Sequence, residues 1–547
     1  MRNKILTIVS FVLLVTFLAG CASPAAPTSE APIAAAPTSE AQETEVTSPE
    51  AEAPAEPAVD ESPKSSRDTL IIATTGDPGR LRSDTINNLV NLPYNRLVYD
   101  YLFTRNEKGE YEPCIAESYQ LDEDNLGVVL TLRQGVKFHD GNVMTAEDVL
   151  ASLIIGKQDT SSGRQLEYIN FDESEIIDDN TLHLRFNTIN GVWQSSLLAI
   201  GIVEKAAYEA AASPDEFYLD PMTTAAYVLQ EWVSGDRLVF KAFPEHWYGA
   251  PKIENIIVRI ITEPSVALME LQTGGVDVLF NMSLENYNSA SKMENVTVYD
   301  GQPPIVVLFV GFNLKNEHLA KLQVRQAIAL AIDWEAITAG AFDGAAEPTV
   351  SPLGKNALGY DPRWEADYPY TFNPEKAKEL LAEAGYSDGL TLRILVDDTP
   401  NRQLMAEQLY NMLAEVGITL DIQKFDMATT NDIVSNSDDY DLYIRGAYNN
   451  SGDIVTFLAT SMGFTAINVE ADTDKGPVYT DYLNRISTEM NIENRVSLYK
   501  EFQEVFMQDM LYWIPGVQNK IYAAYNKDLQ GIEMPGEYWI WNNAYFN

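Results

Sequence analysis

Cysteine is scarce in this sequence, which has only Cys21 and Cys114 among its 547 residues. Two cysteines allow at most one disulfide within the chain, and if Cys21 is modified, Cys114 has no partner. We therefore expect no intramolecular disulfide, so the domain must be held together by its hydrophobic core. With 46% hydrophobic residues, a chain of this length buries most of its surface and divides into two or more lobes.

Basic residues are also few: 37 Lys and Arg stand against 80 Asp and Glu, and the formal net charge is -43. Proteins that bind nucleic acids are basic, because phosphate contacts use Lys and Arg. An acidic chain is repelled by phosphate backbones and by anionic lipid. The charge is expected to keep the protein soluble, and a preference for cationic ligands is the second interpretation.

Only four histidines occur, and no two of them lie within 40 positions of each other, so no local zinc pattern exists. The chain lacks a Gly-x-Ser-x-Gly elbow and a His-Glu-x-x-His motif. Residues 122–127 imitate the start of a calcium loop, but Leu126 and Arg133 stand where ligands are needed. A glycosidase carboxylate pair cannot be recognised without geometry. We expect a protein that is not an enzyme and holds no metal or cofactor.

The N-terminal residues predict export. Arg2 and Lys4 precede an apolar run over residues 5–19, which is too short to be read as a spanning helix. The run ends in Leu-Ala-Gly-Cys21, which resembles the bacterial lipobox, where cleavage precedes a lipid-carrying cysteine. We expect a signal peptide over 1–20 and lipidation of Cys21; an ordinary secretory signal with a chance cysteine is the alternative.

Residues 21–67 are predicted to form a disordered linker. The segment has no aromatic residue and repeats Ala-Pro-Thr-Ser-Glu at 26–30 and 36–40. It cannot bury enough apolar surface to offset the entropy of ordering, and its prolines favour extended conformations. We interpret it as a tether between lipid and domain.

Beyond the linker the chain alternates strand and helix signals, which indicates an α/β or α+β fold. Strands are predicted at 69–74, 128–133, 181–186 and 418–422, and helices at 375–384 and about 402–416, with two more over 478–508. Asn373-Pro374 and Gly385 bracket the first of these helices.

Several blocks occur in a fixed order, among them Tyr111–Ser118, Leu132–Gly141, Gly311–Leu314 and Val324–Asp333. As an ordered set over 69–547 they are similar to the signature of family 5 extracellular solute-binding proteins, the dipeptide, oligopeptide and nickel receptors of ABC importers. The resemblance implies a bilobed periplasmic-binding-protein fold of cluster C type. The chain would cross the hinge twice, and the lobes would close around a ligand.

The resemblance also implies domain boundaries. Lobe 1 would combine 68–111, 221–309 and 522–547, an inserted subdomain would span 112–220, and lobe 2 would span 310–521. The implied function is a monomeric receptor, anchored by lipid on the extracytoplasmic face, that delivers peptides to a permease and ATPase complex. A non-peptide solute (an oligosaccharide, opine or metal chelate) and a non-transport surface receptor or chaperone are the alternatives.

In peptide receptors of this family one loop supplies a Trp and, three residues later, an Asp that pairs with the ligand's ammonium group. Aligned through Asp441, those positions are Ala447 and Asn450 here. A neutral amide cannot neutralise a buried cation. Tyr448 and Asp453 are the candidates to replace the aromatic surface and the charge, and a turn rich in Asn, Ser and Gly is their structural alternative. Arg445 is a candidate for a ligand carboxylate, with a salt bridge as its alternative.

Other parts of the pattern are expected to be structural. Thr145-x-x-Asp148 predicts a helix start with a capping box, and Arg325 lies in a predicted amphipathic helix. His139 is expected to be a satisfied histidine within a loop. By resemblance, the loop at 76–82 should face the cleft, while 221–227 has lost the glycines of a family turn.

Overall fold

The computed structural model describes residues 65–82, 92–106, 110–158, 162–198, 200–301, 305–355, 357–449, 462–534 and 539–547. All of them lie in the unit Pro63–Asn547. Within these residues, no helix is both long and apolar enough to cross a bilayer. Cys21 and the segments predicted as signal peptide and linker up to residue 64 lie outside the described residues.

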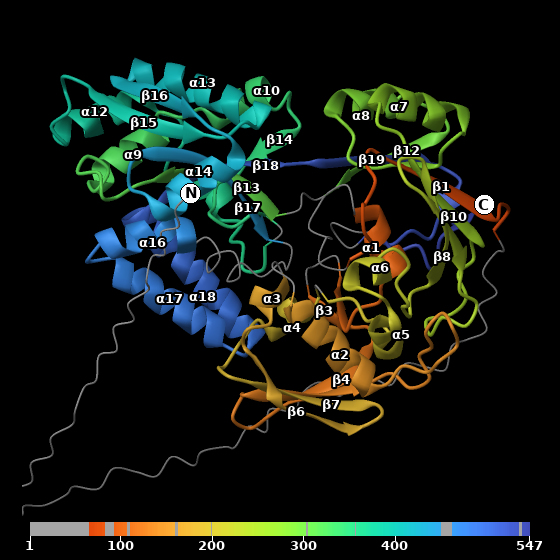
Figure 1. Ribbon diagram of the computed structural model, residues 1–547. Coiled ribbons are helices and arrows are strands. Elements are labelled where there is room, and N and C mark those ends of the chain that lie inside the picture. Colours follow the sequence, from red (N-terminus) through yellow and green to blue (C-terminus); the bar gives the residue numbers. More distant parts are fainter. Residues whose placement is uncertain are drawn as a thin grey trace, which may run out of the picture. The chain divides into compact units, whose positions relative to one another are not determined.

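A seven-stranded sheet, here called the first sheet, has the order β12-β19-β11-β1-β10-β9-β8. Its strands are β1 (Thr69–Thr74), β8 (Tyr227–Val233), β9 (Arg237–Ala242), β10 (Asn255–Ile260), β11 (Val278–Leu279), β12 (Val296–Gly301) and β19 (Ile521–Asn526). The predicted strand at 69–74 is confirmed as β1, which pairs in parallel with β10 and β11. The helices α7 (Pro264–Thr273) and α8 (Leu284–Ala290) lie side by side, and α8 contacts β12 and β19 (Figure 1).

A six-stranded sheet, the second sheet, has the order β14-β18-β13-β17-β15-β16. Its strands are β13 (Ile305–Phe312), β14 (Ala346–Pro348), β15 (Leu390–Val396), β16 (Ile418–Lys424), β17 (Leu442–Asn449) and β18 (Trp513–Asn519). The predicted strand at 418–422 is confirmed within β16. The strand β15 runs parallel to both β16 and β17, whereas β13 pairs with its neighbours in the antiparallel sense.

A four-stranded antiparallel sheet, the third sheet, has the order β4-β5-β7-β6. Its strands are β4 (Ala116–Leu121), β5 (Gly127–Leu132), β6 (Ile169–Asp178) and β7 (Thr181–Phe186). The predicted strands at 128–133 and 181–186 are confirmed, because Val128, Leu130, Leu182 and Leu184 alternate into a core of zero exposure.

The helix α2 (Ala146–Lys157) begins as the sequence predicts. The Thr145 amide donates to Asp148 Oδ2 at 2.9 Å, as in a capping box. The other carboxylate oxygen, Asp148 Oδ1, accepts from the Lys205 amide at 3.1 Å, so the same residue fixes the start of α5 (Lys205–Ala210). Other short elements around this part are α1 (Leu92–Val98), α3 (Ser162–Gln165), α4 (Trp193–Leu197), α6 (Pro214–Phe217), β2 (Phe103–Arg105) and β3 (Tyr111–Pro113).

Helices occur in the same part of the chain as the second sheet. They include α9 (Leu322–Leu330), α10 (Trp334–Ala341), α11 (Trp364–Asp367), α12 (Pro374–Glu383), α13 (Pro400–Glu415), α14 (Met427–Asn436) and α16 (Met462–Ala471). Of these helices, α10 and α13 contact strands of the second sheet. The predicted helix at 375–384 is confirmed as α12, with Asn373 as its N-cap and Gly385 at φ 94° beyond its end. The predicted helix near 402–416 is α13.

The two helices predicted over 478–508 are α17 (Gly476–Thr488) and α18 (Ile492–Val505), followed by a π-helical turn at Phe506–Met510. Leu511, at φ 41°, ends this turn. Arg325, only 2% exposed, donates from Nη2 to the Met510 carbonyl at 2.6 Å and from Nη1 to the Leu319 carbonyl at 2.7 Å. Arg325 therefore supplies donors to the ends of two segments, which is a structural role.

The chain passes between the first and second sheets at two places, from β12 to β13 and from β18 to β19. The strands on either side of these passages are paired with each other. Gly301 pairs with Ile521 in the first sheet, and Val307 pairs with Gln518 in the second sheet. Lys520, between β18 and β19, donates its amide to the Ala345 carbonyl at 3.0 Å. A last pair of strands, β20 (Leu529–Gln530) and β21 (Tyr545–Phe546), follows.

Candidate functional site

The site begins at the carboxyl ends of the parallel strands of the second sheet. In α/β sheets, ligands bind in the crevice outside these ends. The strand β15 ends at Val396 and is followed directly by Asp397, and the neighbouring β17 carries Arg445. Leu395 pairs with Tyr443, and two residues further along each chain segment the charge of Asp397 acts on Arg445.

Asp397 is fixed by its own surroundings. Its carboxylate is 3% exposed, accepts from the Thr399 amide at 3.0 Å and forms an ion pair with Arg402 of α13. Burial acts to raise the pKa of Asp397, but the Thr399 hydrogen bonds and the Arg402 charge outweigh burial, so the pKa lies below its ordinary value. Asp397 and Arg402 therefore hold the start of α13 against the end of β15.

Arg445 is half-buried in the same region, and its Nη1 donates to Asn431 Oδ1 of α14. Burial, more than the nearby Arg402 charge, lowers the pKa of the Arg445 guanidinium to about 10. The group still carries its charge near neutral pH. The attraction between a cation and an anionic ligand is stronger when the cation is partly removed from water than when it is exposed.

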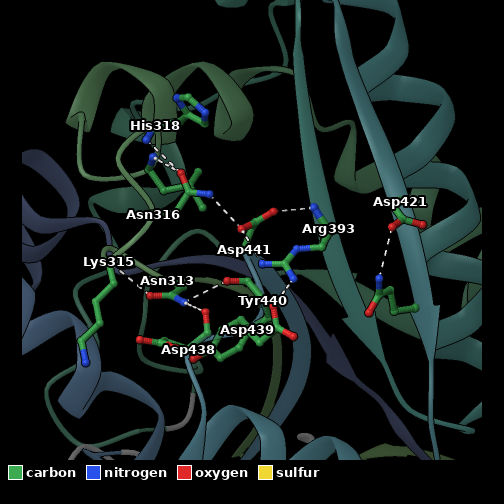
Figure 2. Close-up of polar contacts among 12 residues, drawn as sticks. Asn313, Lys315, Asn316, His318, Arg393, Asp421, Asp438, Asp439, Tyr440 and Asp441 are labelled. Atoms are coloured by element: carbon green, nitrogen blue, oxygen red, sulfur yellow. Dashed lines mark hydrogen bonds and ion pairs between the residues drawn. The ribbon is translucent and has the colours of Figure 1, made fainter.

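A polar network holds the start of β17 (Figure 2). Asp441, 7% exposed, accepts from the Arg393 amide at 2.7 Å and from Asn316 Nδ2 at 2.8 Å. Asn313 Nδ2 donates to the carbonyls of Tyr440 at 2.8 Å and Asp438 at 3.1 Å. The network ties the end of β13 and the strand β15 to the strand that carries Arg445. Asp441, a position shared with the family pattern, thus has a structural role.

The other candidate residues follow Arg445 along the chain. Asn450 and Asp453 lie outside the described residues. For Ala447 and Tyr448 the structure gives the backbone, which pairs with Val307 and Val306 of β13. Of the five ligand candidates, Arg445 is therefore the one whose side chain the structure places.

The loop at 76–82 is held by contacts of its own. The Asp77 carboxylate accepts from the amides of Gly79 at 2.8 Å and Gly235 at 2.7 Å and from Ser234 Oγ at 3.0 Å. Burial would raise the pKa of Asp77, but these hydrogen bonds lower it below its usual value. Asp77 thereby fixes the loop to the turn between β8 and β9.

The four histidines have separate partners. His183 Nε2 contacts Asp122 at 2.9 Å and His318 Nδ1 contacts the Tyr386 hydroxyl at 2.8 Å. Asp122 and Asp124, from the segment that imitates a calcium loop, both contact Arg185. In the described parts of the chain, no three His, Cys, Asp or Glu side chains are grouped to hold a metal.

His139 lies in the segment between β5 and α2 and has the structural role expected for it. Its Nε2 lies 2.8 Å from the Ala225 carbonyl, and its amide donates to the Thr223 carbonyl. These contacts fix the segment 221–227, which the family pattern would have built with glycines. Close by, Asp100 accepts from Trp247 Nε1 at 2.8 Å, Thr224 Oγ1 at 3.0 Å and His246 Nε2 at 3.2 Å.

Acidification from pH 7 to 5 is expected to destabilise the protein through His139. Burial is the main cause that lowers the pKa of His139 below its ordinary 6.5. Below about pH 6.5 the unfolded chain takes up a proton that the folded chain does not, so the free energy of unfolding falls. Asp100, close to His139, stays ionised across this pH range. Burial acts to raise the pKa of Asp100, but the contacts with His246, Trp247 and Thr224 outweigh burial and hold this pKa below its ordinary 3.8.

Urea unfolding at several pH values checks this prediction. His139→Gln retains a side-chain donor and should show a flatter dependence between pH 7 and 5 than the parent. Between pH 7 and 8 the two proteins should differ by a constant amount. Equal slopes below pH 6.5 would contradict the role of His139.

Comparison with known proteins identifies the family of the chain. The model of the family "Bacterial extracellular solute-binding proteins, family 5 Middle" matches residues 110–468, which is more than half of the chain. Heme-binding protein A of Haemophilus influenzae is 25% identical over 518 residues, covering 87% of this chain and 92% of that protein. Glutathione-binding protein GsiB of Escherichia coli K12 is 25% identical over 484 residues, covering 84% and 90%.

The fold comparison confirms the expected architecture. The structure of HbpA2 from Haemophilus parasuis superimposes with a TM-score of 0.79 at 24% identity, over 88% of this chain and 100% of that one. The mixed α/β architecture is that of bilobed periplasmic binding proteins of cluster C. The chain thus belongs to the family 5 extracellular solute-binding proteins, which are substrate-binding components of ABC importers and not enzymes.

Proposed function

We propose that this solute-binding protein is a lipid-anchored receptor that binds peptides between its lobes and delivers them to an ABC permease. Arg445 is the observation that carries the peptide assignment. It places a partly buried cation at the carboxyl ends of parallel strands, where a ligand carboxylate can form a charge-assisted hydrogen bond. The relative named for glutathione, a tripeptide, supports the same class of ligand.

The proposed domain division follows the sheets. Lobe 1 (68–111, 221–309 and 522–547) contains the first sheet except for the first residue of β19, the subdomain (112–220) contains the third, and lobe 2 (310–521) contains most of the second. The proposed ligand segment includes Ala447 and Tyr448 at the end of β17 and extends along the sequence to Asn450 and Asp453. We assign Tyr448 to stacking and Asp453 to an ammonium group, in a protein that acts as a monomer.

A non-peptide solute is the second candidate. Ala447 and Asn450 replace the Trp and Asp that peptide receptors of the family use, and one relative is named for heme, a metal chelate. An amide in place of a carboxylate weakens the recognition of a free ammonium group, which such a solute does not require.

Mass spectrometry of the protein extracted from membranes tests both the anchor and the ligand. The denatured protein should begin at Cys21 and carry the mass of acyl chains, and Cys21→Ala should abolish that mass. Under native conditions the protein should release a series of peptides. A single chelate or a hexose series would replace the peptide assignment with the second candidate, whereas an unacylated N-terminus would refute the anchor alone.

A further inference from the structure

Two segments from different parts of the chain meet at Gly191. One is the turn at 190–192 that leads from β7 of the third sheet into α4, and the other is the connection between α17 and α18. The Gly191 amide donates to the Ser487 carbonyl at 2.6 Å, and the Gly191 carbonyl accepts from Arg495 Nη1. The same Arg495 nitrogen donates to the Glu489 carbonyl at 2.8 Å. Arg495 thus joins both segments.

Apolar side chains cross this contact in both directions. Val192, 6% exposed, belongs to the core of the second sheet although it precedes α4. Met490, between α17 and α18, packs against the core of the third sheet. Val192 thus packs into the core on the side of α17 and α18, and Met490 packs against the core of the third sheet. Both contacts exclude water and stabilise the meeting of the two segments.

The fit at Gly191 leaves no room for a side chain. A Cβ atom there would lie 2.2 Å from the Glu489 carbonyl oxygen and 2.9 Å from its carbon, both of them backbone atoms. The turn has a fixed shape, because Asn190 Oδ1 accepts from the Val192 amide at 3.0 Å. The next residue, Trp193, is anchored with its ring centroid 5.1 Å from that of Tyr119 and 5.5 Å from that of Phe103.

We propose that Gly191, Val192, Ser487, Glu489, Met490 and Arg495 form a clasp that holds the inserted subdomain to lobe 2 when the lobes enclose a ligand. The inference rests on the proposed lobe closure. In this proposal the clasp forms when the lobes close and breaks when they open, so its strength contributes to the fraction of closed protein. A ligand that requires the closed state binds with an apparent affinity reduced in proportion to that fraction.

Hydrogen exchange of the wild-type protein without ligand gives the first test. If the clasp opens without unfolding, the Gly191 amide should exchange at least 10-fold faster than the core amides of β5 and β7 in the same subdomain. Exchange of Gly191 at the rate of those strand amides would overturn the proposal. This measurement involves no ligand, so it is independent of which solute the protein carries.

Gly191→Ala gives the second test, with Ile189→Ala as a control at a neighbouring position whose side chain is 36% exposed. The alanine methyl should weaken the clasp, so segments 189–193 and 485–491 should exchange 10- to 100-fold faster while the strands of the second and third sheets are unchanged. Small-angle scattering should show a larger radius of gyration for Gly191→Ala than for the parent, and an unchanged radius for Ile189→Ala. A folded Gly191→Ala protein with unchanged exchange and radius would overturn the proposal.

Discussion

Replacing Asp277 with alanine is expected to destabilise the domain by about 3 kcal/mol, since a buried acceptor that serves several donors is removed. The Asp277 side chain has no exposed surface and accepts from Arg67 at 2.7 and 2.9 Å and from the Ile71 amide at 2.9 Å. Asn526 Nδ2 lies 3.4 Å away. One carboxylate thus connects β1 and β19 with the residue that precedes the domain, and its loss leaves the Ile71 amide without this acceptor.

Chemical and thermal unfolding of the purified domain measure this effect. Asp277→Asn retains one oxygen acceptor and should lie between the parent and Asp277→Ala. Glu379→Ala removes a carboxylate from the exposed pair with Lys376 and should leave the unfolding midpoint nearly unchanged, because exposed pairs contribute little. If Asp277→Ala were as stable as Glu379→Ala, the carboxylate would have no anchoring role.

Replacing Arg445 with leucine is expected to weaken binding of a carboxylate-bearing peptide about 100-fold, which corresponds to about 2.7 kcal/mol. Leucine keeps apolar contact in the half-buried position but removes the charge and all donors. The loss should appear mainly in the dissociation rate, because a partly buried charge contact is broken on release. Calorimetry with glutathione as the first probe measures the change.

An amide analogue of the same probe separates ligand recognition from structure. If Arg445 contacts the carboxylate, amidation should weaken binding to the parent but hardly change binding to Arg445→Leu. Arg363→Leu, at an arginine 44% exposed, is the matched control and should bind like the parent. If amidation weakened binding equally in the parent and in Arg445→Leu, Arg445 would not contact the ligand carboxylate. Its role would then be a contact within the protein.

The parts of the fold that could be predicted are those where local chemistry and tertiary packing agree. Residues 181–186 alternate apolar and polar side chains, and the sheet buries the apolar set. Asn373, Pro374 and Gly385 supply the cap, first turn and stop that α12 uses. The role of His139 also followed from the sequence, because an isolated histidine without nearby partners is more often structural than catalytic.

The rest depended on contacts between residues far apart in the chain. The predicted site did not include Asp397, Arg402 or Asn431. A signal was present, because Asp397 follows a buried strand and Thr399 and Pro400 mark the start of a helix, which is typical of a site at the end of a strand. The π-helical turn after α18 was missed because Arg325, which caps it, is 185 positions away. For Gly191, no positive φ marks the position, and only the neighbouring Glu489 backbone explains the glycine.

The two passages between the first and second sheets have a consequence for the proposed movement of the lobes. The described strands on either side of the two passages are paired, β12 with β19 and β13 with β18, so in the proposed lobe closure the two passages are expected to bend together. A two-stranded ribbon bends across its face and twists along its length far more readily than it shears within its plane, since shear breaks the ladder of hydrogen bonds. The two lobes should therefore open and close along one direction of movement. Release of the ligand should follow the reverse of the movement that encloses it.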